Sequence, residues 1–405
     1  MISFNIMRKI KFYLLIWCVA LSLGLLAPPS SLSGEQHKQI FVHYMPWYAS
    51  KPISGTWGWH WTMNKFMPEK KPLELASHFV PQIGPYDSFD PHAIEYHVQL
   101  MKLSGINGVI IDWYGVSEFR DYAMIHRNTK ALINVIRKAG LKYVICYEDQ
   151  TIKHRIDQKR IRPEQSLEYA RKDFLWLKTN CFVDSSYLKI SDRPVLLVFG
   201  PQHLKVESWQ QLKKNSAVEL FALPHLSEDA KFDGAFGWPP VHGGKTINRQ
   251  VWEAYLDMLE GRSSKEKIIS IAFPGFKDIY HQANVGPSYG FIDSEKGNTF
   301  KSTFDRAQKD SSLFIQIATW NDFGEGTNIE PTHEYGLVYL EYIQKQTNSH
   351  HDFQSQDLKI PLKLYQLRKS HIKDPLKTHV FDSSSQNLLK GQVEKVRATI
   401  AGEKE

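Results

Sequence analysis

The feature that most constrains the fold is a regular alternation of short apolar runs with longer amphipathic stretches, which begins after residue 38. Most of the short runs are almost continuously apolar, which is typical of parallel strands that are buried on both faces. Eight runs of strand length fit this description: Ile40–Tyr48, Gly108–Tyr114, Tyr143–Asp149, Pro194–Phe199, Val218–Pro224, Gly234–Trp238, Ile268–Pro274 and Leu313–Trp320.

Helical stretches separate many of these runs. Asp90 and Pro91 suit the N-cap and first position of a helix over Pro91–Ser104, and Gly140 suits the C-terminal end of a helix over Tyr122–Ala139. Further helices are predicted over Pro163–Asn180, Glu207–Lys214, Arg249–Glu260, Thr303–Lys309 and Glu334–Gln344.

Strands and helices in this rhythm predict α/β architecture. Eight strand–helix units over about 300 residues are typical of a (β/α)8 barrel, the TIM barrel. A doubly wound open sheet is the alternative. It is disfavoured because the first strand is followed by Tyr44–Tyr48 and not by a glycine-rich phosphate loop.

The N-terminal segment, residues 1–34, predicts export. Arg8, Lys9 and Lys11 precede an apolar run over residues 12–26, and small residues follow it, which is typical of a secretory signal peptide. This run is shorter than the roughly 20 apolar residues that a membrane span needs, which favours a signal peptide. An uncleaved N-terminal anchor is the alternative. We therefore expect a secreted, periplasmic or cell-surface protein, held at a membrane only if this segment stays uncleaved.

The rest of the chain divides by pattern into two parts. Residues 35–348 contain the strand–helix units, and residues 349–405 form a polar, basic C-terminal extension. The apolar stretch Ile360–Leu367 is expected to pack this extension on the barrel. About the last 20 residues are expected to be poorly ordered, as chain ends commonly are.

Composition excludes one class of partner and leaves the others open. The net charge of +7 arises from 50 Lys+Arg against 43 Asp+Glu, a mild excess without a basic arm or a nucleic-acid-binding motif. We therefore expect no nucleic-acid partner. Cys18 lies in the N-terminal apolar run, and Cys146 and Cys181 are predicted to be buried thiols, although one bridge between them remains possible.

Acidic residues at predicted strand ends are the main candidates for chemistry, because active sites of (β/α)8 barrels lie at the C-terminal ends of the strands. Asp112 follows the second strand, Glu148 the third, and Asp322 and Glu325 the eighth. One acid after a strand is more often a helix cap or a turn former, but acids at three strand ends indicate a shared acidic rim. Neighbouring residues complete the predicted substrate-binding set: Tyr44, Trp47, Trp59, His60, Tyr86, Tyr114, Trp238 and Asn321.

Asp322 and Glu325 form the sharpest pair. They lie three residues apart in a turn with Gly324 and Gly326, which allow tight backbone geometry and close approach of a ligand. Like charges in a cleft raise one another's pKa, so that one carboxyl can stay protonated near neutral pH. Glycoside hydrolysis needs this asymmetry, with one carboxyl as the acid and the other as base or nucleophile.

Metal, cofactor and serine-nucleophile chemistry find no support in the motifs. His60, His78, His92 and His97 lie close in sequence, but no HExxH motif or zinc-site spacing is present. A Ser-His-Asp triad is disfavoured because no GxSxG segment occurs. We therefore expect neither a metal nor a cofactor.

Several segments together resemble glycoside hydrolase family 99, the endo-α-mannosidases and endo-α-mannanases. They span about residues 39 to 345: Tyr44–Tyr48, Ile83–Pro91, Ile110–Tyr114, Cys146–Glu148 and Asn321–Glu330. Family 99 typically has Glu at the position of Asp322, whereas the form Trp320-Asn321-Asp322 is similar to family 71, the α-1,3-glucanases. The chain thus resembles the broad 71/99-like group and is closest to family 99.

This resemblance implies a (β/α)8 barrel, no metal and retention of configuration. Glu325 matches the family's acid, and Asp322 matches its base, thought to act on the 2-hydroxyl to form an anhydro-sugar. Glu148 falls where the family carries a glutamate that approaches that hydroxyl. Because Asp is one methylene shorter than Glu, a family 71-like inverting route, with Asp322 as base on water, is the alternative.

The expected function is endo-acting hydrolysis of an α-linked glycan, mannan-like or glucan-like, by carboxylate acid/base catalysis. Asp112 and the aromatic set would line the cleft, with an oligosaccharide or polysaccharide as the substrate and a monomer as the working form. Two alternatives stay open: a glycosyltransferase or transglycosylase of surface-polysaccharide assembly, and a non-catalytic glycan-binding protein.

Overall fold

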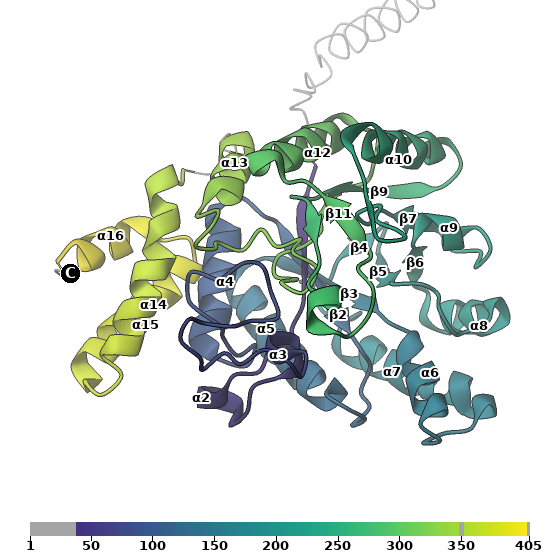
Figure 1. The fold of residues 1–405 in the computed structure, drawn as a ribbon, viewed down its shortest axis with the longest axis horizontal. Helices are drawn as coiled ribbons and strands as arrows, with labels where there is room; N and C mark the ends of the chain where they lie inside the picture. The colour runs from purple at the N-terminus through teal and green to yellow at the C-terminus, as the bar shows by residue number, and fades with distance from the viewer. Residues whose placement is uncertain (1–37, 348–351, 403–405) are drawn as a thin grey trace, which may run out of the picture. The chain divides into compact units, whose positions relative to one another are not determined.

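The computed structural model describes residues 38–347 and 352–402, so the predicted signal peptide or anchor lies outside the described residues. Parallel strands close into a barrel in which β12 returns to pair with β1, Ile40 lying opposite Ile315 (Figure 1). The eight barrel strands are β1 (Ile40–Tyr44), β2 (Gly108–Trp113), β3 (Lys142–Tyr147), β5 (Arg193–Val198), β6 (Glu219–Ala222), β7 (Gly234–Phe236), β9 (Lys267–Ala272) and β12 (Ile315–Ile317). The predicted (β/α)8 barrel is confirmed, and each predicted strand supplies one of these strands.

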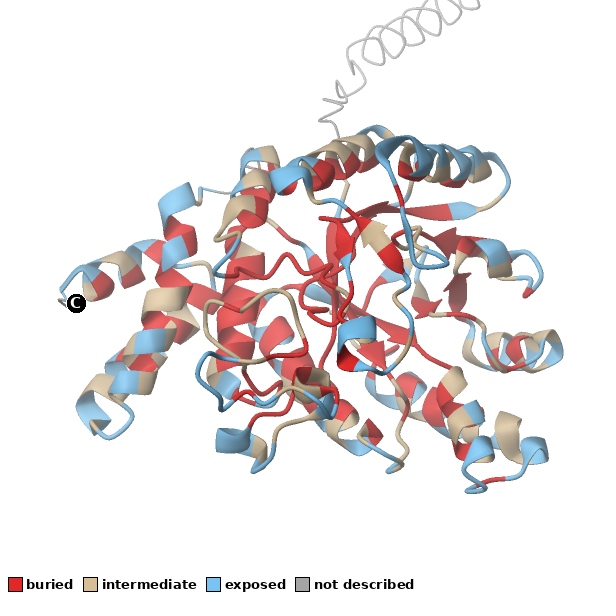
Figure 2. Ribbon diagram, viewed as in Figure 1, coloured by how far each residue is buried: buried red, intermediate tan, exposed pale blue. Residues whose placement is uncertain are grey.

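Helices follow the strands and turn their apolar faces to the barrel, so that burial falls on the strands and on the inner helix faces (Figure 2). They are α4 (Pro91–Leu103), α5 (Tyr122–Ala139), α6 (Gln150–Asp157), α7 (Ser166–Asn180), α8 (Val206–Ser216), α9 (Pro224–Ser227), α10 (Arg249–Gly261), α12 (Asn298–Lys309) and α13 (Val338–Thr347). The predicted helix ends hold: the Asp90 side chain accepts a bond from the backbone N–H of His92, and Gly140 ends α5 with φ 69°.

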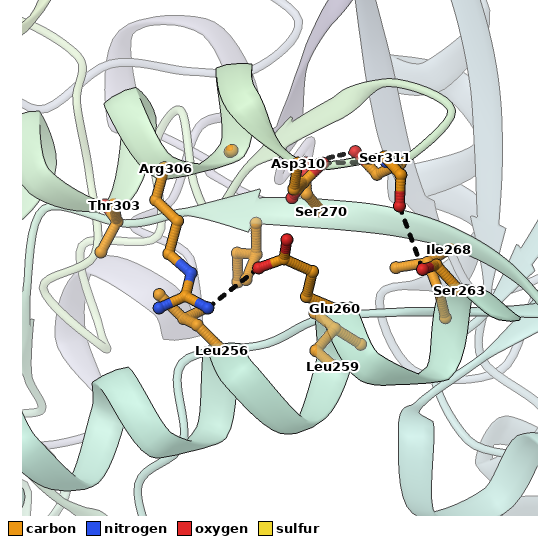
Figure 3. Close-up of a pocket in the computed structure, with 13 residues that line it drawn as sticks. Leu256, Leu259, Glu260, Ser263, Ile268, Ser270, Thr303, Arg306, Asp310 and Ser311 are labelled. Carbon is orange, nitrogen blue, oxygen red and sulfur yellow. Dashed lines mark hydrogen bonds and ion pairs between the residues drawn. The ribbon is translucent and has the colours of Figure 1, made fainter.

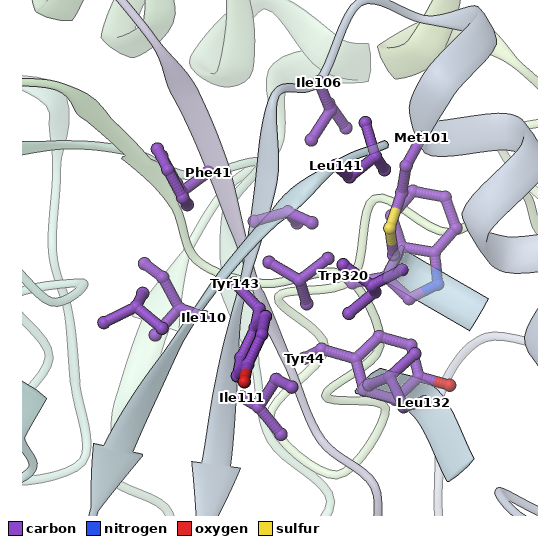
Figure 4. Packing of buried hydrophobic residues seen from close by; sticks show 14 of the residues in the cluster. Phe41, Tyr44, Met101, Ile106, Ile110, Ile111, Leu132, Leu141, Tyr143 and Trp320 are labelled. Atoms are coloured by element: carbon purple, nitrogen blue, oxygen red, sulfur yellow. The ribbon is translucent and has the colours of Figure 1, made fainter. Parts of the chain in front are cut away.

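The core between the strands and the helices is built from large side chains that water does not reach. Figure 4 shows Phe41, Ile110, Tyr143 and Trp320 in this packing, and each of these side chains is fully buried. Burying a side chain of this size stabilises the fold by roughly 1.5–3 kcal/mol. The barrel is therefore a rigid support for the polar residues at its rim.

Two groups of short elements follow strand ends and cover the same end of the barrel. After β1 come α2 (Lys51–Ser54) and α3 (Trp59–Thr62). After β7 and β9 a small second sheet forms, with strand order β10-β11-β8. Its strands are β8 (Lys245–Thr246), β10 (Phe276–Lys277) and β11 (Gly290–Ile292), and the short helix α11 (Tyr280–Ala283) lies between β10 and β11 in the chain. Elsewhere, the short strand β4 (Lys189–Ile190) pairs antiparallel with the start of β5.

The C-terminal extension forms α14 (Ile360–Ser370), α15 (Pro375–Leu389) and α16 (Val393–Gly402). The helices α14 and α15 lie beside α4, and α16 packs against α14 and α15 (Figure 1). Arg368 Nη1 lies 2.6 Å from Glu95 Oε2 on α4 in a buried ion pair. The sequence predicted poor order for about the last 20 residues, whereas the structure has helix there, because Val396 on α16 is fully buried. Among the helices that the structure describes, none is long and apolar enough to cross a membrane.

Candidate active site

A pocket of about 730 Å³ opens at the C-terminal end of the barrel. All four predicted acids line it: Asp112, Glu148, Asp322 and Glu325. The structure therefore brings together residues that lie as far apart in sequence as β2 and the segment after β12. Six of the predicted substrate-binding residues line the same pocket: Trp47, Trp59, His60, Asp112, Tyr114 and Trp238.

The turn after β12 fixes Asp322 and Glu325 against each other. Asp322 Oδ1 accepts a bond of 2.9 Å from the backbone N–H of Glu325, and the backbone N–H of Asp322 donates to Thr319 Oγ1 at 2.8 Å. Gly326 has φ 63°, and a Cβ there would lie 2.6 Å from the carbonyl oxygen of Lys277. Only glycine fits this position, so the turn holds both carboxyls with little freedom.

Glu325 is placed to stay protonated. Its Oε2 is buried without a hydrogen-bond partner, and Oε1 accepts a weak bond of 3.4 Å from the Tyr280 hydroxyl. Burial first, and then the charge of Asp322, raise the pKa of Glu325 well above its usual value. A carboxylic acid in this state can donate a proton at neutral pH.

Asp322 has a different environment although it lies in the same turn. Burial raises its pKa to about 6, and bonds from the backbone N–H groups of Glu325 and Gly324 act against that rise by stabilising the charged form. An ionised Asp322 therefore favours the protonated form of Glu325. This is the asymmetry that acid/base catalysis by two carboxyls requires.

Glu148, at the end of β3, faces the pair across the pocket. Burial raises its pKa to about 7, and a hydrogen bond from the Gln150 side chain opposes this shift. The residue is therefore close to half-ionised at neutral pH. It can accept a hydrogen bond from a substrate hydroxyl or donate one to it.

His43, Asp112 and Cys146 form a buried polar cluster beside the other acids, with one possible ligand atom from each within 4.8 Å of the others. Burial lowers the pKa of His43 to about 3 and raises the pKa of the Asp112 carboxyl and of the Cys146 thiol. Metals bind thiolates, and burial here favours the neutral thiol. We therefore assign these three residues to a polar cluster, where His43 Nδ1 and Asp112 Oδ2 have no partner. Cys146 and Cys181 are both free and buried, as the sequence predicted.

Aromatic rings form one wall of the pocket. Trp47 and His60 stack with centroids 4.1 Å apart and an interplanar angle of 6°. His60 Nε2 also lies 3.7 Å from Asp121 Oδ2, which fixes the orientation of the imidazole. Trp59 is 40% exposed, an unusual degree for a tryptophan, and it is available to stack on a sugar ring.

Three predicted substrate-binding residues, Tyr44, Tyr86 and Asn321, are not among the residues that line this pocket. They are buried, and their polar atoms bond within the protein. The Tyr44 hydroxyl bonds His97 at 2.9 Å, and the Tyr86 hydroxyl donates to Glu330 at 2.8 Å. Asn321 joins Met45 to Tyr86, so these residues support the strand ends next to the pocket.

Sequence reasoning missed part of the pocket wall. Tyr280, Tyr289, Val241 and Phe276 line it from the second sheet and its loops. Val241 and Phe276 follow predicted strand ends but are apolar, while Tyr280 and Tyr289 lie further along the loop after β9. Only the two tyrosines carry a usable signal, since tyrosine in a long loop after a barrel strand is a candidate for ligand contact.

A second hollow, between α10, β9 and α12, is too small for a ligand. Its free volume of about 10 Å³ leaves room for about one water molecule. Arg306 spans it to Glu260 at 3.0 Å, and Ser311 bonds Ser263 (Figure 3). This hollow is a packing seam, and the acidic pocket is the candidate site.

Known proteins resemble this chain in sequence and in fold. The family model "Glycosyl hydrolase family 99" matches residues 36–356. The glycoprotein endo-alpha-1,2-mannosidase-like protein of Danio rerio is 22% identical over 351 residues, which is 77% of this chain and 76% of that protein. The glycoprotein endo-alpha-1,2-mannosidase of Rattus norvegicus is 22% identical over 344 residues, with 75% and 71% covered.

A solved structure shows the same fold. The GH99 endo-alpha-mannosidase from Bacteroides thetaiotaomicron is similar with a TM-score of 0.59 at 18% identity, over 77% of this chain and 98% of that one. At such low identity the likeness supports the barrel alone. The family match extends over most of the chain, and on that ground this protein belongs to glycoside hydrolase family 99.

Proposed function

We propose that this glycoside hydrolase cleaves an α-linked glycan, mannan-like or glucan-like, at bonds within the chain. One observation carries the proposal: Asp322 and Glu325 share one rigid turn in the pocket, yet they differ in which carboxyl holds its proton more firmly. The names of the relatives, endo-alpha-1,2-mannosidases among them, support the α-linkage and endo action.

The catalytic roles follow from the two environments. Glu325 donates its proton to the glycosidic oxygen as the bond to the leaving sugar breaks. Asp322 takes a proton from the attacking hydroxyl, which belongs either to water or to the 2-hydroxyl of the same sugar. Glu148 accepts a hydrogen bond from a sugar hydroxyl and orients the ring. The anomer that forms first separates the two routes, inversion for water and retention for the 2-hydroxyl.

Endo action is supported by the length of the cleft. A second cavity of about 840 Å³ adjoins the first. The two share seven lining residues: Trp47, Trp59, His60, Tyr114, Glu148, Gln150 and His154. We call the cavity with the four acids the catalytic arm and the other the second arm. A cleft that continues in this way can hold several consecutive sugar residues, which suits cleavage inside a chain.

Product analysis on a panel of α-mannans and α-glucans tests the proposal. We expect shorter oligosaccharides from at least one substrate, and the Glu325→Gln variant should stop their release. Longer products would instead indicate a transglycosylase, and tight binding without turnover would indicate a glycan-binding protein. If Glu325→Gln cleaved a substrate at the native rate, the assignment of the acid would be wrong.

A further inference from the structure

The second arm of the cleft has no assigned role. It is walled by the segment after β1, by the loop between β2 and α5, and by the first turns of α5 and α6. It meets the catalytic arm at Glu148 and Trp59, which line both cavities. A glycan that occupies the catalytic arm can therefore extend into it.

The two arms differ in charge. Among the described residues that line the catalytic arm there are four carboxyl groups and no lysine or arginine. The second arm carries Arg120 and Arg127. Its own acid Asp121 lies beside His60, and the shared Glu148 is bonded by Gln150. The cleft thus passes from an acidic end to an end with two guanidinium groups.

Arg127 is held in place without an ionic partner. Its Nε and Nη2 donate to Asn128 Oδ1 at 3.3 and 3.2 Å, and its guanidinium carbon lies 4.0 Å from the centre of the Phe89 ring. Asn128 is itself fixed, because its amide donates to the carbonyl oxygen of Pro46 at 2.9 Å. The guanidinium is therefore oriented by neutral groups, and its charge is left for another partner.

Arg120 also has no carboxylate within ion-pair distance among the residues that the structure describes, and the same holds for Arg127. Arg120 has φ 53°, a conformation that is costly for a residue with a side chain. Both arginines are exposed, neither forms an ion pair among the described residues, and the charge of Arg120 acts on Asp121 only from outside ion-pair distance. Two such cations in one cavity favour an anionic group, which guanidinium binds through two parallel hydrogen bonds.

We propose that the second arm binds a sugar residue that carries an anionic group, a phosphate or a carboxylate, so that the glycan cleaved by this protein is acidic. Arg120 and Arg127 bind the anion, and Trp59, at the junction, stacks on the adjoining ring. This inference rests on the proposed function, since it names the substrate class of the same cleft.

The test compares matched substrates. The probes are a neutral α-linked tetrasaccharide, the same tetrasaccharide with one 6-phosphate, and the same with one uronic acid. The measured quantity is the ratio of kcat/KM for the charged probe to kcat/KM for the neutral probe. We expect a ratio of about ten or more for the native protein, the effect of one charged hydrogen bond, and a decrease of the ratio with added salt.

Arg120→Gln and Arg127→Gln should each lower this ratio, and the double variant should bring it close to one. Lys130→Gln is the matched control, because Lys130 is an exposed cation of α5 that lines neither arm. Its ratio should equal the native ratio. The phosphate and uronic acid probes show which anion the arm prefers.

A native ratio near one overturns the inference, and so does a high ratio that the two arginine variants leave intact. Calorimetry on the Glu325→Gln variant separates this failure from failure of the proposed function. One outcome is that the charged probe binds more strongly than the neutral one, that this preference is lost when both arginines are replaced, and that the native protein turns over neither probe. That outcome would keep the anion site and reject the hydrolase proposal. Equal binding of neutral and charged probes would reject the anion site.

Discussion

Two sets of buried polar residues meet at the same end of the barrel, and they differ in how their atoms are paired. The supporting set lies next to the pocket and consists of Tyr44, Tyr86, His97, Asn321 and Glu330. Both carboxylate oxygens of Glu330 are bonded, one to His97 at 3.1 Å and one to Tyr86 at 2.8 Å. His97 bonds Tyr44 through its other nitrogen at 2.9 Å.

The pocket set consists of His43, Asp112, Glu148, Asp322 and Glu325. Here His43 Nδ1, Asp112 Oδ2 and Glu325 Oε2 are buried without hydrogen-bond partners. Leaving a buried polar atom unpaired costs about 1–3 kcal/mol. The supporting set avoids this cost, while the pocket set retains it, which is the expected state of groups that pair with a substrate.

Adjacent residues of one turn belong to different sets. Asn321 joins the backbone of Met45 to Tyr86 and so fixes the strand end, whereas Asp322, the next residue, lines the pocket. The comparison therefore teaches that rigidity and reactivity at this rim come from separate side chains. Substitutions should separate the two sets, because one set governs turnover and the other governs stability.

The largest expected effect is on turnover, from Glu325→Gln. We expect kcat/KM to fall by about a thousandfold, since the amide cannot supply the proton that the acid supplies. The free energy of unfolding should change by less than about 1 kcal/mol, because the amide is nearly the same size as the protonated carboxyl and, like it, carries no charge. Kinetics and urea denaturation measure the two quantities, and a loss of stability above about 1 kcal/mol would contradict the separation.

The next effect is on stability and depends on pH. Burial raises the pKa of Glu148 to about 7 in the folded chain, against an ordinary value of 4.5. Between these values the unfolded chain has released the proton that the folded chain still holds, so this carboxyl lowers the free energy of unfolding as pH rises. The full effect is at most about 3 kcal/mol, complete above pH 7 and absent below about pH 4.

Glu148→Gln tests this directly, because the variant lacks the titrating group. The difference in unfolding free energy between the variant and the native chain should grow in the variant's favour from pH 4 to pH 7. Burial also raises the pKa of Asp322, which acts in the same direction but is present in both proteins. A difference that stays constant with pH would show that Glu148 titrates as an ordinary carboxyl.

Glu330→Gln, in the supporting set, should have the opposite balance of effects to Glu325→Gln, with a larger loss of stability and a smaller loss of turnover. The amide replaces one acceptor oxygen with a donor, so that either His97 or Tyr86 loses a partner in a buried site. We expect a loss of about 2 kcal/mol in the free energy of unfolding and a smaller loss of kcat/KM than for Glu325→Gln. If Glu330→Gln instead abolished turnover without a change in stability, Glu330 would belong to the pocket set.

The sequence predicts the barrel well because its signal is local. Apolar runs of strand length and helix-end residues such as Asp90 and Gly140 act through nearby backbone, and these positions hold in the structure. The acids were predictable for a related reason, since a strand end fixes which rim a side chain reaches. Glu148 and Asp322 line the same pocket although they lie 174 positions apart in the sequence.

The supporting set was not predictable, because it depends on contacts between distant segments. Tyr86 stands in a long loop whose aromatic residues suggested ligand contact, but its hydroxyl is used by Glu330. Glu330 carries no signal of its own, since nothing in the spacing shows that His97 will lie beside it. The wall residue Tyr280 was missed because the loop after β9 folds back over the pocket.

The smallest expected effect comes from Tyr280→Phe, at the edge of the pocket set. Its hydroxyl donates a long bond of 3.4 Å to Glu325 Oε1, and this bond opposes the rise in the pKa of Glu325 by favouring the charged form. Removing it should raise that pKa further and move the alkaline limb of the kcat/KM profile to higher pH. The rate at the optimum should fall by roughly threefold to tenfold, the value of one neutral hydrogen bond. Tyr365→Phe removes a hydroxyl from α14, away from the pocket, and should leave the profile in place. A limb that shifts to lower pH in Tyr280→Phe would mean that the hydroxyl stabilises the protonated acid, and Tyr280 would then orient the proton on Glu325 instead of easing its loss.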